Sequence, residues 1–271
     1  MENKKVIFIT GATRGIGRNM ALYFARENYI VVGSGRNEDK LNEVREEILK
    51  ISGDHRMITM DVTDEQDIKD AVKYTIDAFG KIDVWVNNAG SFQAIGPTWE
   101  VNTEDFKNDL TTNIIGTFNC THHVVPVMLQ QQFGKIINIV GGGTIGTFKY
   151  GNGYGVSKTA IARFTENLSA ELEDTNVDTY ALDPGLNDTD MTRYQRDSKV
   201  GQSYLSGIEK LFEDEIDVKP DVAPAWVLNM AEDKVTEFKG RIISVYDQLE
   251  ELKEFAENTK EEDYYQLRLK K

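Results

Sequence analysis

Short apolar runs alternate with amphipathic stretches of helical spacing along most of this chain. The expected strands lie at residues 6–10, 29–33, 55–61, 82–86, 135–140, 178–183 and 241–245. Continuous apolar runs are typical of strands buried on both faces, and parallel sheets are the ones that helices cover on both sides. The alternation therefore predicts an α/β fold, a doubly wound parallel sheet of about seven strands with helices on both faces.

A single domain is expected to take up the whole chain, residues 1–271. This length, with 40% apolar residues, suits one large α/β domain with a sizeable core. A long helical stretch at 103–132 is expected to bend at Pro126. Residues 186–219 have no regular apolar period, which favours a mobile substrate lid. The tail at 247–271 has the Glu, Lys and Leu pattern of a surface or subunit-contact helix.

Composition argues against several classes of partner. The 45 acidic and 31 basic residues give a net charge of −14, which would repel nucleic acid and anionic lipid. No run of about 18 apolar residues could span a membrane, and the first apolar run is too short for a signal peptide. Cys120 is the sole cysteine, and the three histidines form no ligand pattern. We expect a cytoplasmic protein with no metal site and no nucleic-acid or membrane partner.

A glycine-rich loop joins the first expected strand to the helix that follows. Its sequence is Thr10-Gly11-Ala12-Thr13-Arg14-Gly15-Ile16-Gly17. Backbone N–H groups and the dipole at a helix N-terminus can hold a pyrophosphate. The loop therefore predicts a dinucleotide site that contains Gly11, Thr13, Arg14, Gly15, Ile16 and Gly17. The spacing G-x-x-x-G-x-G differs from the common G-x-G-x-x-G fingerprint, and a tight turn without a ligand is the alternative.

The end of the second expected strand indicates which dinucleotide is bound. The segment Gly33-Ser34-Gly35-Arg36-Asn37 has no carboxylate to bind a ribose 2′-hydroxyl and repel a 2′-phosphate. Arg36, together with Arg14, offers forked donors that suit a phosphate. This favours NADP(H), the alternative being that either arginine is only a surface charge. Asp61 and Val62, after the third strand, are placed to contact the adenine.

Tyr154 and Lys158 lie at the start of a helix expected over residues 154–173. Side chains four residues apart share one face of a helix. A fixed ammonium favours phenolate and so lowers the pKa of a tyrosine, which is normally about 10. The pair is interpreted as an acid/base, although the same spacing is common on solvated helix faces.

Several motifs, in order and at strand ends, resemble those of the short-chain dehydrogenase/reductase family. They are the glycine-rich loop, Asn87-Asn88-Ala89-Gly90, Asn113, Tyr154 with Lys158, and Pro184-Gly185 with Thr189, within residues 5–245. The resemblance implies one Rossmann-type domain that assembles as a homodimer or homotetramer. It also implies hydride transfer between a nicotinamide and an alcohol or carbonyl substrate.

The resemblance further implies a role for each matching residue. Tyr154 would give or take the proton, Lys158 would bind the nicotinamide ribose, and Asn113 would hold a water in the proton path. The residues that would line the cofactor or contact its nicotinamide end are Asn88, Ala89, Gly90, Pro184, Gly185 and Thr189. These positions agree with the rule that open α/β sheets bind ligands at the carboxyl ends of their strands.

One member of the family's pattern is missing. The family usually has a serine 13 residues before the tyrosine, where it orients the substrate oxygen, and this chain has Gly141 there. The role would fall to a backbone N–H of the loop at residues 141–144, or to the hydroxyl of Thr144. Without a substitute, one lost oxyanion donor costs about 2.7 to 4 kcal/mol of transition-state stabilisation.

The leading hypothesis is reduction of a small to medium carbonyl compound by NADPH. Aromatic and aliphatic residues at 91–96, at 144–153 and in the expected lid would suit an apolar substrate. Two alternatives are kept. One is an NADP(H)-binding regulatory or scaffold protein with little or no turnover, and the other is an NAD-dependent alcohol dehydrogenase.

Overall fold

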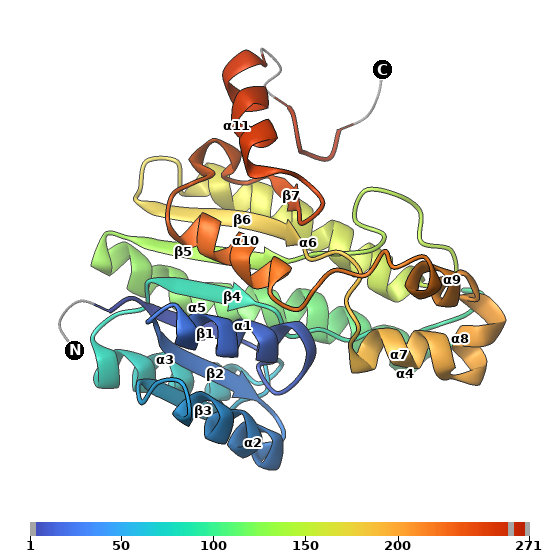
Figure 1. Ribbon diagram of the computed structural model, residues 1–271, viewed down its shortest axis with the longest axis horizontal. Coiled ribbons are helices and arrows are strands. Elements are labelled where there is room, and N and C mark those ends of the chain that lie inside the picture. The colour runs from blue at the N-terminus through green and yellow to red at the C-terminus, as the bar shows by residue number, and fades with distance from the viewer. Residues whose placement is uncertain (1–3, 260–262, 269–271) are drawn as a thin grey trace.

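A seven-stranded parallel sheet forms the centre of the protein (Figure 1). The computed structural model describes residues 4–259 and 263–268. The strands are β1 (Val6–Ile9), β2 (Ile30–Gly35), β3 (His55–Thr59), β4 (Val84–Asn87), β5 (Gly134–Ile139), β6 (Val177–Asp183) and β7 (Ile242–Ser244). Their order is β3-β2-β1-β4-β5-β6-β7, and every neighbouring pair is parallel. The predicted doubly wound α/β fold is confirmed.

Helices cover both faces of the sheet because successive side chains of each strand point to opposite sides. Ile7 and Ile9 of β1 join one core cluster, and Val6 and Phe8 join the other. The helices of the first cluster are α1 (Gly15–Arg26), α2 (Glu38–Leu49), α10 (Val222–Ala231) and α11 (Leu249–Asn258). Those of the second cluster are α3 (Glu65–Phe79), α5 (Gly116–Gln131) and α6 (Asn152–Glu171).

The stretch at 103–132 departs from α-helical geometry at a place other than the one expected. It consists of α4 (Thr103–Leu110), a π-helical turn η1 (Thr111–Ile115) and then α5. The helix α5 continues through Pro126, and a bend of its axis at that residue stays a prediction. Pro126 lies on the exposed side of α5, where water can satisfy the carbonyl that a proline leaves without a donor.

The expected lid contains three short helices that the sequence did not predict, and the described part of the tail is helical over a shorter length than expected. Residues 186–219 include α7 (Asp190–Asp197), α8 (Lys199–Tyr204) and α9 (Gly207–Glu213), beside α4 in Figure 1. After the short 3-10 helix η2 (Thr236–Phe238) and β7, α11 is the helix found among the described residues of the tail, 247–259 and 263–268. Residues 263–268 fold back instead, and the Tyr265 carbonyl accepts a hydrogen bond from the Ile242 N–H at 2.9 Å. The tail helix predicted at 260–262 and 269–271 lies outside the described residues.

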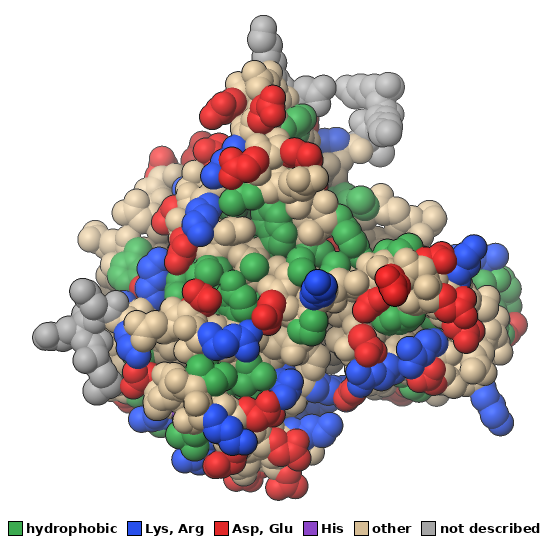
Figure 2. Space-filling view, in the orientation of Figure 1, with side chains coloured by type: hydrophobic (Ala, Val, Ile, Leu, Met, Phe, Trp, Pro, Cys, Tyr) green, Lys and Arg blue, Asp and Glu red, His purple; other side chains and the backbone are tan. Residues whose placement is uncertain are grey.

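The surface of the described part of the chain mixes both signs of charge. On the face shown in Figure 2, acidic and basic side chains lie among one another, without a continuous basic band among the side chains drawn in colour. Among residues 4–259 and 263–268, no helix has the length and apolar character needed to cross a membrane.

The helix α1 packs unusually close to the loop before it and to the end of β4. A Cβ on Gly17 would lie 2.3 Å from the Gly11 carbonyl oxygen and 2.5 Å from Asn88 Nδ2. Real side chains do not approach that closely, so only glycine allows this packing. The glycine at position 17 is therefore required by the approach of two backbone segments.

Gly17→Ala tests this close packing, because the packing decides whether the substitution raises or lowers the free energy of unfolding. Alanine usually stabilises a helix interior by about 1 kcal/mol over glycine, whereas an overpacked site typically costs about 1–3 kcal/mol. We expect urea denaturation to show a net loss of stability. Gly207→Ala in α9, where a Cβ would meet nothing within 4 Å, is the control and should not destabilise the protein. A Gly17→Ala protein as stable as the wild type would contradict the close packing.

Candidate active site

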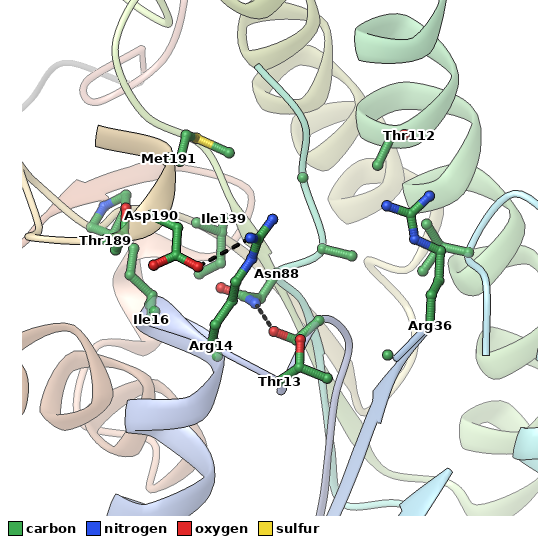
Figure 3. Close-up of a pocket in the computed structure, with 18 of the residues that line it drawn as sticks. Thr13, Arg14, Ile16, Arg36, Asn88, Thr112, Ile139, Thr189, Asp190 and Met191 are labelled. Atoms are coloured by element: carbon green, nitrogen blue, oxygen red, sulfur yellow. Dashed lines mark hydrogen bonds and ion pairs between the residues drawn. The ribbon is translucent and has the colours of Figure 1, made fainter. Parts of the chain in front are cut away.

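A cleft lies at the carboxyl ends of the strands, where β1 and β4 are neighbours although they are not consecutive along the chain (Figure 3). The expected site residues that line it are Gly11, Thr13, Arg14, Gly15, Ile16, Gly17, Arg36, Asp61, Val62, Asn88, Ala89, Gly90, Tyr154, Lys158, Pro184 and Thr189. The lining residues that the sequence did not single out are Gly35, Met60, Thr112, Ile139, Val140, Asp190 and Met191. The cleft thus unites the glycine-rich loop with the Tyr154–Lys158 pair.

The glycine-rich loop turns directly into the N-terminus of α1. Gly11 and Gly15 have φ angles of +69° and +53°, which side chains other than glycine rarely adopt. Arg14 precedes the helix without capping it through its side chain, and the first turn of α1 has no acidic residue. Because no side chain satisfies or neutralises this helix end, its N–H groups and dipole are available to an anionic ligand.

Hydrogen bonds tie the glycine-rich loop to the end of β4. The Thr10 Oγ1 atom accepts from the backbone N–H groups of Asn88 and Ala89, both at 3.0 Å. In return, Asn88 Nδ2 donates to the carbonyl oxygens of Thr10 at 2.8 Å and of Gly11 at 3.3 Å. The Asn88 side chain is therefore committed to holding the loop, and Ala89 and Gly90 follow it along the cleft.

The two arginines expected to bind phosphate lie in different environments (Figure 3). Arg14 reaches toward α7, where its Nη1 lies 3.1 Å from Asp190 Oδ2. Arg36 stands apart, with 76% of its side chain exposed and its Nη1 3.7 Å from Asp61 Oδ2. A carboxylate thus does lie near the end of β2, although Asp61 also accepts two hydrogen bonds from Thr63. Arg36 is the arginine with more of its donors open to a phosphate.

Tyr154 lies in the first turn of α6, half-buried at the wall of the cleft. The Phe92 ring stacks on it at a centroid distance of 4.7 Å and an interplanar angle of 21°. Lys158 Nζ lies 5.4 Å from the centroid of the Tyr154 ring and donates to the Ile139 carbonyl oxygen at 2.8 Å. The tyrosine and the lysine therefore share one site, and the end of β5 fixes the ammonium.

The electrostatics of the pair differ from the expectation. Burial raises the pKa of Tyr154, and the carboxylates of Asp183 and Asp109 raise it further. Burial also lowers the pKa of Lys158 to about 8, against an opposing effect of Asp183. The predicted lowering of the Tyr154 pKa by Lys158 is wrong for this structure, because removal from water disfavours the charged forms of both groups.

Asn113 lies in the π-helical turn and is fully buried. Its Nδ2 donates to the Ser91 carbonyl oxygen at 2.9 Å and to Ser157 Oγ at 2.8 Å. Its Oδ1 accepts from the Ser91 N–H at 2.7 Å. The side-chain amide thus joins the π turn to the segment after β4 and to α6.

Gly141, at the position where the family usually has a serine, lies close to the Tyr154 hydroxyl. A Cβ on Gly141 would lie 2.9 Å from Tyr154 Oη. The Thr144 hydroxyl donates to the Gly141 carbonyl oxygen at 2.6 Å and accepts from the Gly141 N–H at 3.1 Å. A hydroxyl has one proton to donate, so Thr144 has none left for a substrate oxygen. The expected use of the Thr144 hydroxyl as an oxyanion donor does not fit this arrangement, and the Gly141 N–H is also engaged. The use of the N–H groups of Gly142 or Gly143 stays a prediction.

Gly185 and the expected lid residues lie outside the cleft. A Cβ on Gly185 would lie 2.8 Å from Val245 Cγ2, and its φ of +67° marks a turn between β6 and α7. The expected lid residues that do not line the cleft are Tyr194, Tyr204, Leu205, Leu211 and Phe212. The lid segment instead contributes Thr189, Asp190 and Met191.

Phe92 and Phe148 belong to the ranges 91–96 and 144–153 that were expected to border the substrate, but their packing against Tyr154 was not predicted. Phe148 lies 5.5 Å from Phe92 and 6.2 Å from Tyr154 between ring centroids. Cβ atoms on Gly142, Gly143, Gly151 or Gly155 would all lie within 3.4 Å of the Phe148 side chain. The sequence showed the run of glycines, but only the fold shows that they make room for this ring.

Comparisons with known proteins agree with this geometry. The model of the short chain dehydrogenase family matches residues 5–200. A serine 3-dehydrogenase from Rhizobium radiobacter is 30% identical over 212 residues, which cover 78% of this chain and 84% of that protein. Two solved structures are each 26% identical to this chain with a TM-score of 0.82. The first, actinorhodin polyketide ketoreductase with NADPH, matches over 90% of this chain and 97% of its own. The second, NAD⁺-bound xylitol dehydrogenase, matches over 89% of this chain and 97% of its own. The chain belongs to the short-chain dehydrogenase family of NAD(P)-dependent oxidoreductases.

Proposed function

We propose that this protein reduces a small to medium carbonyl compound with NADPH. The observation that carries the proposal is that Tyr154 and Lys158 line the same cleft as the glycine-rich loop. A dinucleotide whose pyrophosphate binds the N-terminus of α1 can therefore extend toward the phenol. The related ketoreductase with NADPH supports this direction, and the related xylitol dehydrogenase with NAD⁺ keeps NAD-linked alcohol oxidation as an alternative.

When bound, the nicotinamide supplies the hydride that forms the new bond at the carbonyl carbon. Tyr154 donates its phenolic proton to the carbonyl oxygen, which leaves an alcohol. The raised pKa of Tyr154 keeps the phenol protonated at neutral pH, which is the state that reduction needs. Alcohol oxidation uses the same group in reverse and needs the phenolate as its base.

Lys158 has the role of a cationic anchor for the nicotinamide ribose. Its Nζ is held by the Ile139 carbonyl oxygen and is close to the cleft wall formed by Gly90, where a Cβ would lie 3.7 Å away. Asn113 has no free side-chain donor for a water, because both Ser91 and Ser157 engage its amide. A water in the proton path could only donate to Asn113 Oδ1, which accepts one hydrogen bond from the Ser91 N–H and has a second lone pair.

The substrate oxygen is expected to rest on Tyr154 without help from a neighbouring side-chain hydroxyl. The space that a serine side chain would need at position 141 lies against the Tyr154 hydroxyl. One missing oxyanion donor lowers turnover by about 10²–10³-fold. We therefore expect a slow reductase. A regulatory NADP(H)-binding protein is the second candidate, because a site without this oxyanion donor could also have no turnover at all.

Tyr154→Phe tests the proton-donor role. Turnover should fall by about 10²–10⁴-fold, the usual contribution of a positioned acid, while NADPH binding is retained. The assay is NADPH oxidation with a panel of ketones and aldehydes, and binding is followed by NADPH fluorescence. Tyr74→Phe on α3, half exposed and outside the cleft, controls for the chemical change. Equal turnover by wild type and Tyr154→Phe, or none by either, would overturn the proposal.

Arg36→Ala tests the preference for NADPH over NADH. A hydrogen bond to a charged group contributes about 1.5–3 kcal/mol, so the Kd for NADPH should rise about 10- to 100-fold. The Kd for NADH should change little, because NADH has no 2′-phosphate. Arg45→Ala removes a nearby exposed charge from α2 outside the cleft and is the matched control. An equal effect of Arg36→Ala on both cofactors would refute the discrimination.

Gly141→Ser asks whether the family's serine can simply be restored. Because a Cβ there would lie 2.9 Å from Tyr154 Oη, the substitution should displace the phenol and lower turnover rather than raise it. Gly146→Ser, in the same loop with nothing within 4 Å of a Cβ, should leave turnover unchanged. A clear gain in kcat for Gly141→Ser would show that the position is free to accept the serine.

A further inference from the structure

The carboxylate of Asp109 is the one buried acid in α4, and its only effect described so far is on the pKa of Tyr154. Its side chain is fully buried. Asp109 Oδ1 accepts hydrogen bonds from Ser91 Oγ at 2.7 Å and from the Gln93 N–H at 2.8 Å. Asp109 Oδ2 accepts from the Ala94 N–H at 3.0 Å and from the Gln93 N–H at 3.1 Å. One carboxylate therefore fixes the backbone of residues 91–94.

The segment at 91–94 carries the ring that covers the proposed proton donor. Phe92 lies between the residues that Asp109 holds, is itself buried, and stacks on Tyr154 at 4.7 Å. Asp109 also lies against the start of α6, because a Cβ on Gly153, the residue before Tyr154, would be 3.3 Å from Asp109 Oδ2. The Asp109 carboxylate is thus next to Tyr154 on two sides, at Gly153 in the chain and at the Phe92 ring that stacks on the tyrosine.

A buried carboxylate is a costly way to obtain stability alone. Removing an ionised group from water costs several kcal/mol, and a well-packed apolar residue often stabilises a protein as well or better. A carboxylate that accepts hydrogen bonds from two backbone N–H groups and a hydroxyl does, however, restrict the positions of these three donors. This makes Asp109 better suited to orientation than to stability.

We propose that Asp109 is a positioning residue for Tyr154, acting through residues 91–94 and the Phe92 ring. The proposal rests on the proposed function, because it takes Tyr154 to be the proton donor. Asp109 does not line the cleft, so its effect should fall on the chemical step and leave cofactor binding unchanged.

Asp109→Asn tests the role, because the amide of asparagine has one acceptor oxygen where the carboxylate has two, so the hydrogen bonds accepted by one of the two oxygens are lost. A misplacement of about 1 Å can cost about 10²-fold in rate, so we expect kcat to fall by about 10- to 100-fold at an unchanged Kd for NADPH. Phe92→Leu should produce a similar fall. The double variant should be no slower than the slower single variant, because both act through one path. Glu104→Gln, which neutralises an exposed carboxylate of the same helix, should leave kcat unchanged.

A second readout does not depend on turnover. The ¹⁹F resonance of 3-fluorotyrosine at position 154, assigned by its absence in Tyr154→Phe, should shift in both Asp109→Asn and Phe92→Leu. If the wild type does not turn over but the resonance shifts, the proposed function fails and the positioning role stands. If the wild type turns over but Asp109→Asn leaves kcat and the resonance unchanged, the positioning role is overturned. Should Asp109→Asn not fold, an unchanged kcat and resonance in Phe92→Leu would also overturn it.

Discussion

The hydrogen bonds at Thr10 hold together the two strand ends on which the site depends. β1 and β4 are adjacent in the sheet but far apart in the chain, and Thr10 Oγ1 accepts from two successive N–H groups after β4. Asn88 returns two hydrogen bonds to the glycine-rich loop, and Gly17 lets α1 pack against both. The end of the cleft suited to phosphates and the wall leading to Tyr154 are thereby fixed relative to one another, before any ligand contributes.

Burial decides the chemistry of the other end of the cleft. Phe92 covers the Tyr154 ring, Lys158 is anchored to Ile139, and both titratable groups shift toward their neutral forms. A phenol that stays protonated is in the state that a proton donor needs, and burial beside Phe92 favours that state. A Cβ at position 141 would lie 2.9 Å from Tyr154 Oη, so little space is left there for a side chain beside the phenol.

The sequence predicted the sheet and most of the cleft because both depend on local pattern. Apolar strands, helix stripes and glycine spacing determine where strands end, and cofactor residues lie at those ends. Contacts between distant segments were not predictable: the commitment of Thr144 to Gly141, the Arg14–Asp190 pair and the Asp109 bonds all depend on loop conformation. The helices α7 to α9 were missed because each has eight residues or fewer, too short for a clear apolar period.

The central claim is that hydride and proton reach one carbonyl group in this cleft without a serine. Transfer of deuterium from NADPH labelled at the reactive C4 position to a ketone, followed by mass spectrometry of the product, tests it most directly. The account predicts an alcohol with one deuterium on the carbinol carbon, formed slowly by the wild-type protein. Tight NADPH binding with no deuterated alcohol from any ketone or aldehyde in a broad panel would contradict it and favour a regulatory role.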